Sequence, residues 1–260
     1  MTVAIFGDVH GCLDELALLL NQLKDVDTIV SVGDLTDKGP DSNGCLELVV
    51  ERGIILVNSN HDDKYIQFLK KNRAASTIKQ EHRRILYESL SPKARAYLLT
   101  AIPFFRGEYD VIKNFIVVHG GIGPNHRLFP IDGKSYNEIL RIRYVDKDTL
   151  EKVSTIHNID GTWGPEHNNV WKWQEVYHGQ YGPVIHGHIV EKLGIPSIWE
   201  NGKRRDFTEP YSLIAPNTIL SIDTGCVYGG ALTAAVINKD GGISIRQVKS
   251  LKCYTPEHGE

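Results

Sequence analysis

Residues 7–11 read GDVHG, which places an aspartate and a histidine two positions apart with a glycine on each side. A side chain that serves only packing does not need glycines beside it. Glycines let the backbone turn sharply and come close to an ion or a phosphate group. Carboxylate oxygens and imidazole nitrogens are common donors to divalent metals. Asp8 and His10 are therefore candidate metal ligands.

The same combination of polar residues and glycines recurs after five later segments that we expect to be strands. These segments end in GDLTDKG, NSNHDD, VVHGG, IHGHI and SIDTG, and they carry Asp34, Asp37, Asn60, His61, His119, His186, His188 and Asp223. Ligands of an open α/β sheet bind at the carboxyl ends of its strands. Six segments that are far apart in the sequence are thus expected to bring their donors to one rim.

The donor set contains oxygen and imidazole nitrogen but no thiolate, which is the mixture that manganese, iron and zinc sites use. It is larger than the coordination shell of one ion, so we expect two ions. A bridging carboxylate is the usual way to hold two ions about 3.5–4 Å apart. Such a pair activates water and neutralises phosphoryl oxygens, which is the chemistry of phosphoester hydrolysis.

The elements that must position these side chains alternate between strand and helix. Strands are expected at 2–6, 27–33 and 54–57, and helices at 12–23 and 41–52. The first helix carries leucines at three- and four-residue spacing, and Asp41 or Ser42 can cap the second. Strand and helix that alternate with short links predict a parallel α/β sheet.

The rest of the chain divides into a helical part, a weakly periodic part and more strands. Residues 62–102 are expected to be helical, with Ser91 and Pro92 as the N-cap and first residue of the last helix. Residues 124–182 are expected to form an inserted cap or long loops. Further strands are expected at 115–122, 183–189, 217–225, 231–238 and 243–250.

The composition is that of an ordinary soluble globular protein of 260 residues. The net charge of −3 gives no reason to expect general binding to nucleic acid or membranes. Four cysteines stand without C-x-x-C spacing, which favours reduced thiols and a cytoplasmic location. There is no signal-peptide pattern and no apolar run that would span a membrane.

In the order GDVHG, GDLTDKG, NHD, HGG and GH, the motifs resemble the calcineurin-like metallophosphoesterases, in particular the phosphoprotein-phosphatase branch. The segments GPDS and SIDTGCVYGGALTAAVI resemble bacterial symmetrical diadenosine tetraphosphatases and the phosphatase module of polynucleotide kinase-phosphatases. The resemblance covers nearly the whole chain and is weakest over 124–182. It implies one domain over 1–260, folded as a four-layer α/β/β/α sandwich with a helical and loop insertion over the active site.

The resemblance also implies a role for each motif residue. Asp8 and His10 would hold the first metal ion, and Asp34 would bridge the two ions. Residues Asn60, His119 and His188 would hold the second ion, and Asp223 would also reach the pair. In catalysis His61 would be the general acid, oriented by Asp37. The cofactor would be two divalent ions, with manganese preferred over iron or zinc.

Three positions depart from the common pattern of the family. Ser59 replaces a glycine, which would be unfavourable by roughly 1–2 kcal/mol if the position needs a positive φ. Lys38 replaces an arginine and offers a phosphate only a point charge. Arg141 and Arg143 are then candidates for a further substrate contact, with exposed charges as the alternative for both. His186 is an additional histidine for which a supporting role is expected rather than metal ligation.

The predicted function is hydrolysis of phosphoester or phosphoanhydride bonds by a metal-activated hydroxide. A nucleotide-type substrate is preferred, either a nucleoside polyphosphate such as diadenosine tetraphosphate or a phosphate at a polynucleotide end. The alternatives are a Ser/Thr protein phosphatase and a metal-binding protein without catalysis. No membrane contact and no stable protein partner are predicted. The aromatic segment 162–179 is either a platform for stacking bases or a loop packed over the sheet.

Overall fold

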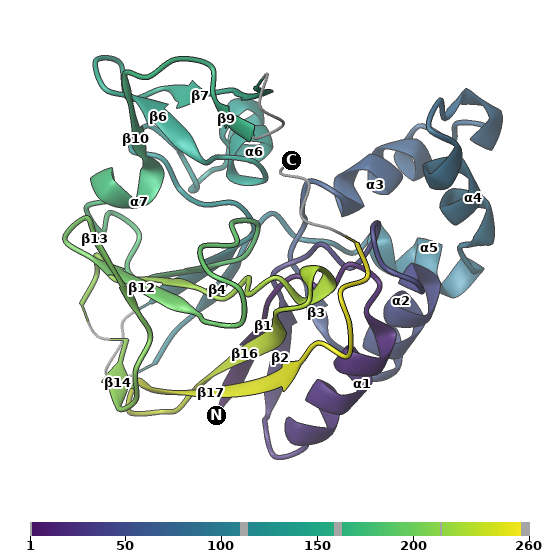
Figure 1. Ribbon diagram of the computed structural model, residues 1–260, viewed down its shortest axis with the longest axis horizontal. Helices are drawn as coiled ribbons and strands as arrows, with labels where there is room; N and C mark the ends of the chain where they lie inside the picture. Colours follow the sequence, from purple (N-terminus) through teal and green to yellow (C-terminus); the bar gives the residue numbers. More distant parts are fainter. Residues whose placement is uncertain (1, 110–113, 159–162, 214, 256–260) are drawn as a thin grey trace.

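Two six-stranded sheets form the centre of the computed structural model, which describes residues 2–109, 114–158, 163–213 and 215–255 (Figure 1). In spatial order the first sheet contains β14 (Tyr211–Ser212), β17 (Gly242–Lys249), β16 (Ala231–Ile237), β1 (Val3–Phe6), β2 (Thr28–Ser31) and β3 (Ile55–Leu56). The second contains β13 (Lys203–Asp206), β12 (Ser197–Glu200), β15 (Ile219–Ser221), β11 (Val184–His186), β5 (Phe115–Val118) and β4 (Phe105–Gly107). In each sheet, the three strands that lead to the predicted site run parallel.

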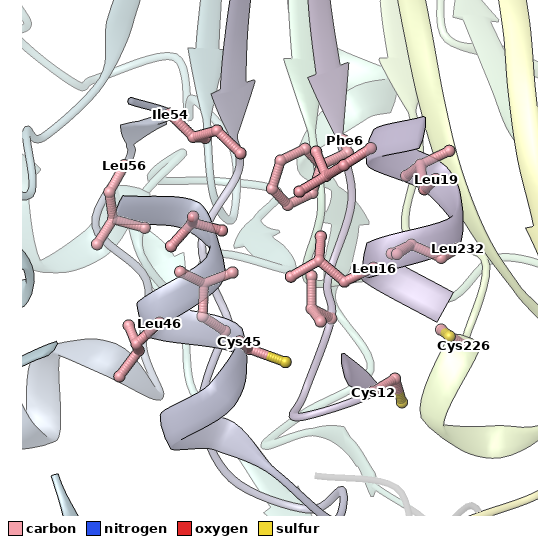
Figure 2. Close-up of a cluster of buried hydrophobic side chains, with 14 of the residues drawn as sticks. Phe6, Cys12, Leu16, Leu19, Cys45, Leu46, Ile54, Leu56, Cys226 and Leu232 are labelled. Carbon is pink, nitrogen blue, oxygen red and sulfur yellow. The ribbon is translucent and has the colours of Figure 1, made fainter. Parts of the chain in front are cut away.

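Helices cover the outer face of the first sheet on one side of the molecule (Figure 1). They are α1 (Leu13–Gln22), α2 (Ser42–Glu51), α3 (Asp62–Lys70), α4 (Glu81–Ser89) and α5 (Pro92–Leu98). Figure 2 shows how Phe6 of β1 lies beside Leu16 and Leu19 of α1, with Leu46 of α2 in the same cluster. Burial of these apolar side chains holds the helical layer against the sheet.

The two sheets face each other across a second apolar core. Side chains alternate along a strand, so Phe6 points to the helices while Val3 and Ile5 point to the second sheet. From that sheet, Val117 and Ile185 join the same buried cluster. This double use of β1 explains why its sequence is apolar without interruption, as expected for a strand that is buried on both faces.

The outer face of the second sheet is covered by the insertion between β5 and β11. The insertion contains α6 (Gly133–Ile139), β6 (Tyr144–Asp146), β7 (Lys152–Val153), β8 (Thr155–His157), β9 (Trp163–Pro165), β10 (Val170–Lys172) and α7 (Trp173–Val176). Strands β10, β6 and β7 pair as a small sheet of their own. Trp173 and Ile139 are fully buried against Ile116 of β5.

The predicted four-layer fold is confirmed, with several corrections in detail. Segment 62–102 was predicted to be helical throughout, but turns separate α3, a 3-10 helix at Ala75–Thr77, α4 and α5, and residues 99–102 return toward the sheet. Within the described residues, Ser91 caps α5 by accepting from the backbone N–H of Ala94 at 3.2 Å, as predicted. Strands β4, β12, β13 and β14 were not predicted.

The aromatic segment 162–179 begins at a residue outside the described ranges. Of its tryptophans, Trp173 is fully buried in the core beneath the insertion, whereas Trp171 is 41% exposed. Packing therefore explains Trp173 and leaves Trp171 at the surface. Among the described residues, no helix has the length and apolar character that crossing a membrane requires.

Candidate metal centre and its surroundings

The predicted metal ligands converge at one rim because both sheets end their parallel strands there. Each ligand group follows a strand directly: β1, β2 and β3 in the first sheet and β5, β11 and β15 in the second. Six of the seven predicted ligands are buried, namely Asp8, His10, Asp34, Asn60, His119 and Asp223, and His188 is half-buried. The structure thus brings the whole set together, with three groups of donors from each sheet.

Asp34 lies at the middle of this set. Its Oδ2 is 3.5 Å from Nε2 of His10, and its Oδ1 is 3.4 Å from Nε2 of His119. Potential metal ligands form two groups that share Asp34: one with His10 and His61, the other with His119 and His188. A carboxylate that turns one oxygen toward each of two groups has the arrangement that bridging two ions requires.

The backbone fixes which nitrogen of each histidine faces Asp34. Nδ1 of His10 donates to the carbonyl oxygen of Thr36 at 3.0 Å, and Nδ1 of His119 donates to that of Val32 at 3.0 Å. A neutral ring whose Nδ1 carries the proton presents a lone pair at Nε2. Both lone pairs therefore point at carboxylate oxygen, an arrangement that a cation between them stabilises.

Asp8 and His188 connect the two sheets across the rim. The carboxylate of Asp8 accepts from the backbone N–H of His188 at 3.1 and 3.2 Å. Nε2 of His188 is buried and has no hydrogen-bond partner among the described residues. Its partner would be an ion, since a buried polar nitrogen without a partner is costly.

Electrostatics favour a cation at the same place. Burial, together with the charges of Asp223 and Asp34, raises the pKa of Asp8 well above its ordinary value. The pKa of Asp223 is likewise raised, chiefly by burial. Burial, and next the charge of Lys38, lowers the pKa of His10 to about 3, which keeps its imidazole neutral and able to donate a lone pair. Crowded carboxylates and neutral imidazoles fit two divalent ions.

The backbone at the rim is strained in five places outside glycine. The left-handed φ angles are 48° at His10, 51° at Asp34, 68° at Asp37, 67° at Lys38 and 65° at His188. Such residues cost of order 1–3 kcal/mol each and occur mainly at functional sites. These backbone conformations lower the stability of the fold and orient the predicted metal ligands.

His61 and Asp37 form the predicted acid pair. Nδ1 of His61 is 2.8 Å from Oδ2 of Asp37, and Tyr65 donates its hydroxyl to the other oxygen. Burial opposes ionisation of Asp37, but these hydrogen bonds and the charge of His61 outweigh it and lower its pKa to about 2. An ionised Asp37 holds the His61 ring through its Nδ1 edge, which is the orientation that the predicted role of His61 as general acid requires.

Lys38 lies at the edge of the first group of ligands. Its Nζ donates to the hydroxyl of Tyr228 at 2.7 Å and is 3.4 Å from Nε2 of His10. Tyr228 belongs to a 3-10 helix, Cys226–Tyr228, directly after the loop that carries Asp223. Sequence analysis did not single out Tyr228, although it lies within the quoted segment SIDTGCVYGG.

The structure separates the two arginines. Arg143 donates to the carbonyl oxygen of His188 at 3.3 Å, so it lies beside the rim. Arg141 faces Asp63 at 3.6 Å, and its side chain is 39% exposed. The ring of His186 lies 5.0 Å from that of Trp173 in the core.

Ser59 and Asp62 hold the loops of the site in place. Ser59 does not have a positive φ, so serine imposes no backbone strain there, and its Oγ accepts from the backbone N–H of Asp62 at 3.2 Å. The fully buried carboxylate of Asp62 accepts from the backbone N–H groups of Leu35 and Thr36 and from the Thr36 hydroxyl. Asp62 was missed, and the only signal was the doubled aspartate in NHDD.

Comparison with known proteins places the chain in a family. A family model described as calcineurin-like phosphoesterase matches residues 1–192. The bis(5′-nucleosyl)-tetraphosphatase PrpE of Oceanobacillus iheyensis, named as asymmetrical, is 28% identical over 256 residues, covering 90% of this chain and 88% of that protein. The symmetrical bis(5′-nucleosyl)-tetraphosphatase of Proteus mirabilis is 27% identical, covering 90% and 93%.

A solved structure whose description names a diadenosine tetraphosphatase superimposes with a TM-score of 0.65 at 26% identity, covering 96% of this chain and 93% of that one. Serine/threonine-protein phosphatase 1 of Salmonella typhimurium is 44% identical, but over only 63 residues, or 23% of this chain. The family assignment, together with a rim of donors arranged about Asp34, agrees with the predicted chemistry. The chain belongs to the calcineurin-like phosphoesterases and is a metal-dependent hydrolase with a dinuclear centre of divalent ions.

Proposed function

We propose that this phosphoesterase hydrolyses a nucleotide, with a dinucleoside polyphosphate such as diadenosine tetraphosphate as first choice and a polynucleotide-end phosphate as second. The names of the relatives that match along most of the chain support a nucleoside tetraphosphate. The observation that carries the phosphoesterase chemistry is the position of Asp34, whose two oxygens face separate histidines at 3.5 and 3.4 Å.

The predicted ligands Asp8, His10, Asp34, Asn60, His119, His188 and Asp223 would hold two divalent ions, with manganese as first choice and iron or zinc as alternatives. When bound, the ions supply Lewis acidity and lower the pKa of water toward neutrality. His61 gives a proton from Nε2 to the leaving oxygen, and Asp37 holds the ring for that transfer. Lys38 beside His10 and Arg143 beside His188 contribute positive charge at the rim, where phosphoryl oxygens gain negative charge in the transition state.

A reducing cytoplasm is the proposed location, without a stable protein partner. Cys12, Cys45 and Cys226 are buried free thiols, and Cys253 is an exposed one. Free thiols are typical of reducing compartments, whereas secreted proteins usually pair them.

The proposal is tested with purified protein that has been stripped by a chelator and reloaded with manganese, iron or zinc. Diadenosine tetraphosphate, a 5′-phosphorylated oligonucleotide and a phosphoserine peptide are compared by kcat/KM. We expect manganese to give the highest activity and the tetraphosphate to be the best substrate. Chromatography of the products distinguishes two ADP from ATP plus AMP, and thus symmetrical from asymmetrical cleavage.

A phosphopeptide as the best substrate would instead support the protein-phosphatase alternative, to which the short Salmonella match points. No turnover of any substrate, p-nitrophenyl phosphate included, would contradict the assignment of a working catalytic centre. Asp34→Asn serves as the matched negative control in each assay.

A further inference from the structure

A cavity of about 220 Å³ lies beside the candidate metal centre, where the insertion meets the second sheet. It is lined by Arg143, Tyr144, Lys172, Gln174 and residues 189–191. Figure 1 shows α7, which carries Gln174, between the small sheet of the insertion and strands β12 and β13. Ile189, which lines the cavity, directly follows the predicted ligand His188 in the chain. Arg143 also lines the cavity and donates to the His188 carbonyl oxygen at 3.3 Å, so it lies next to both the cavity and the metal centre.

Three buried polar atoms of two side chains in this cavity lack hydrogen-bond partners among the described residues. Gln174 is 1% exposed, and neither its amide nitrogen nor its amide oxygen has a hydrogen-bond partner. Glu191 uses Oε2 to bind Lys172 and Arg204, each at 3.3 Å, but its buried Oε1 has no partner. Leaving a buried donor or acceptor unpaired costs about 1–3 kcal/mol, so these atoms indicate a site for a ligand.

The unpaired atoms restrict the chemistry of that ligand. Gln174 offers one donor group and one acceptor, and Glu191 offers a further acceptor, so the ligand must both donate and accept. A phosphate group alone brings chiefly acceptors and would leave both oxygens unpaired. An amino group beside a ring nitrogen brings both, and glutamine pairs in this way with N6 and N7 of adenine. Tyr144 and Ile189 add apolar surface suited to the faces of a ring.

The charges and the size of the cavity agree with a nucleotide that enters base first. Its volume is below the roughly 300–1,000 Å³ of sites that enclose a drug-sized ligand, which suits one base rather than a whole dinucleotide. Arg143 stands between the cavity and the rim, where it can pair with a phosphate that the base carries.

We propose that this cavity is the subsite for the adenine of the substrate, read by Gln174 and Glu191 through its exocyclic amine, with Arg143 on the attached phosphates. The assignment rests on the proposed function, because it takes the substrate to be a nucleotide. It makes the insertion and residues 189–191, not the metal ligands of the rim, the parts of the chain that select the base.

The test is calorimetric titration of the manganese-loaded full chain with three probes: AMP, purine riboside 5′-monophosphate, which lacks only the amine, and ribose 5-phosphate. We expect AMP to bind about 5- to 150-fold more tightly than purine riboside monophosphate, since a correct amide–base pair discriminates by about 1–3 kcal/mol. In Gln174→Met, the preference for AMP over purine riboside monophosphate should shrink, because only Glu191 Oε1 is then left to accept from the amine. Gln80→Met, a change at an exposed glutamine before α4, is the matched control.

Equal affinity of the wild-type protein for AMP and purine riboside monophosphate would overturn the assignment, even if diadenosine tetraphosphate is hydrolysed, and would leave ordered water as the partner of Gln174. Discrimination by the amine without hydrolysis of any nucleotide would support the cavity assignment and overturn the proposed function alone. Thermal unfolding checks that Gln174→Met is folded. The wild-type comparison needs no variant, so it decides the question even if that variant does not fold.

Discussion

The rim and the neighbouring cavity differ in how their polar atoms are held. At the rim, Asp34, Asp8, His10 and His119 bond to backbone groups of the segments that follow β2, β3 and β11, so both sheets contribute. In the cavity, Gln174 and one oxygen of Glu191 are buried without partners among the described residues. The rim is thus fixed before a substrate arrives, whereas the cavity is completed by one.

This difference divides the work of catalysis between two parts of the chain. In the proposed function, the donors of the rim would contact only metal and phosphoryl groups, which every phosphoester substrate shares. The cavity lies between the insertion and residues 189–191 and would contact what differs between substrates. Variants at the rim should therefore damage turnover of all substrates, and variants in the insertion should change the preference among them.

Asp34→Asn should have the largest effect. The amide cannot bridge two ions as a carboxylate does, so several kcal/mol of transition-state stabilisation are lost. We expect kcat/KM to fall by about 10⁴-fold or more for both diadenosine tetraphosphate and p-nitrophenyl phosphate. Elemental analysis should show less than two equivalents of manganese. Asp14→Asn, at an exposed position of α1, is the control, and a selective loss on one substrate would contradict the general role of the rim.

His61→Ala should have the second largest effect, and its size should depend on the leaving group. We expect a loss of about 10²–10⁴-fold for an alkyl phosphate, whose leaving oxygen needs a proton. The loss should be smaller for p-nitrophenyl phosphate, since its leaving group is stable as an anion. His178→Ala changes an exposed histidine and should do neither. Equal losses on both substrates would remove His61 as the acid.

Metal removal should lower stability, and more so as the pH rises. The pKa values of Asp8 and Asp223 are raised in the folded protein above the ordinary 3.8, chiefly by burial. The metal-free folded state therefore holds these protons more tightly than the unfolded chain, and its stability falls as the pH rises above 3.8 through the raised values. Manganese replaces the protons and relieves the repulsion.

Calorimetric melting with and without manganese, at pH 5 and pH 8, measures this effect. At 100 times the Kd measured at pH 5, the ion should add about 2.7 kcal/mol at that pH, or roughly 5–10 °C in Tm. The same concentration of manganese should add more at pH 8. A larger gain at pH 5 would mean that the carboxylates do not face the ions.

The ligands of the rim could be predicted from the sequence because each one lies in a short motif that can be recognised without knowledge of the fold. Each ligand follows an apolar strand and stands beside a glycine or another polar residue, so Asp8, Asp34 and His119 are visible without knowledge of the fold. The resemblance then supplied the order of the sheets and the four layers, which short motifs alone do not determine.

The positions that the sequence did not indicate depend on contacts between distant segments. Asp62 holds the loop of Asp34 through hydrogen bonds 26 and 27 residues apart, and Gln174 acquires its meaning only where α7 meets residues 189–191. The hairpin of β12 and β13 did carry a local signal: Asn201 and Gly202 both have positive φ at its turn, as Asn-Gly turns require.

Substitutions at the two predicted arginine contacts should have the smallest effects on kinetics. Comparing them separates a residue beside the rim from one at the surface. Arg143 touches the loop of His188, so Arg143→Ala should raise KM for a phosphate substrate by about tenfold, as expected for a lost charge-assisted hydrogen bond of about 1.5 kcal/mol.

Arg141 instead makes an exposed ion pair with Asp63. Such pairs contribute about 0–1 kcal/mol, so Arg141→Ala should change KM less than about fivefold. Steady-state kinetics with p-nitrophenyl phosphate and diadenosine tetraphosphate measures both variants against each other. A larger effect at Arg141 would mean that the substrate approaches along the side of α3 instead of the insertion, because Asp63 lies in the first turn of that helix.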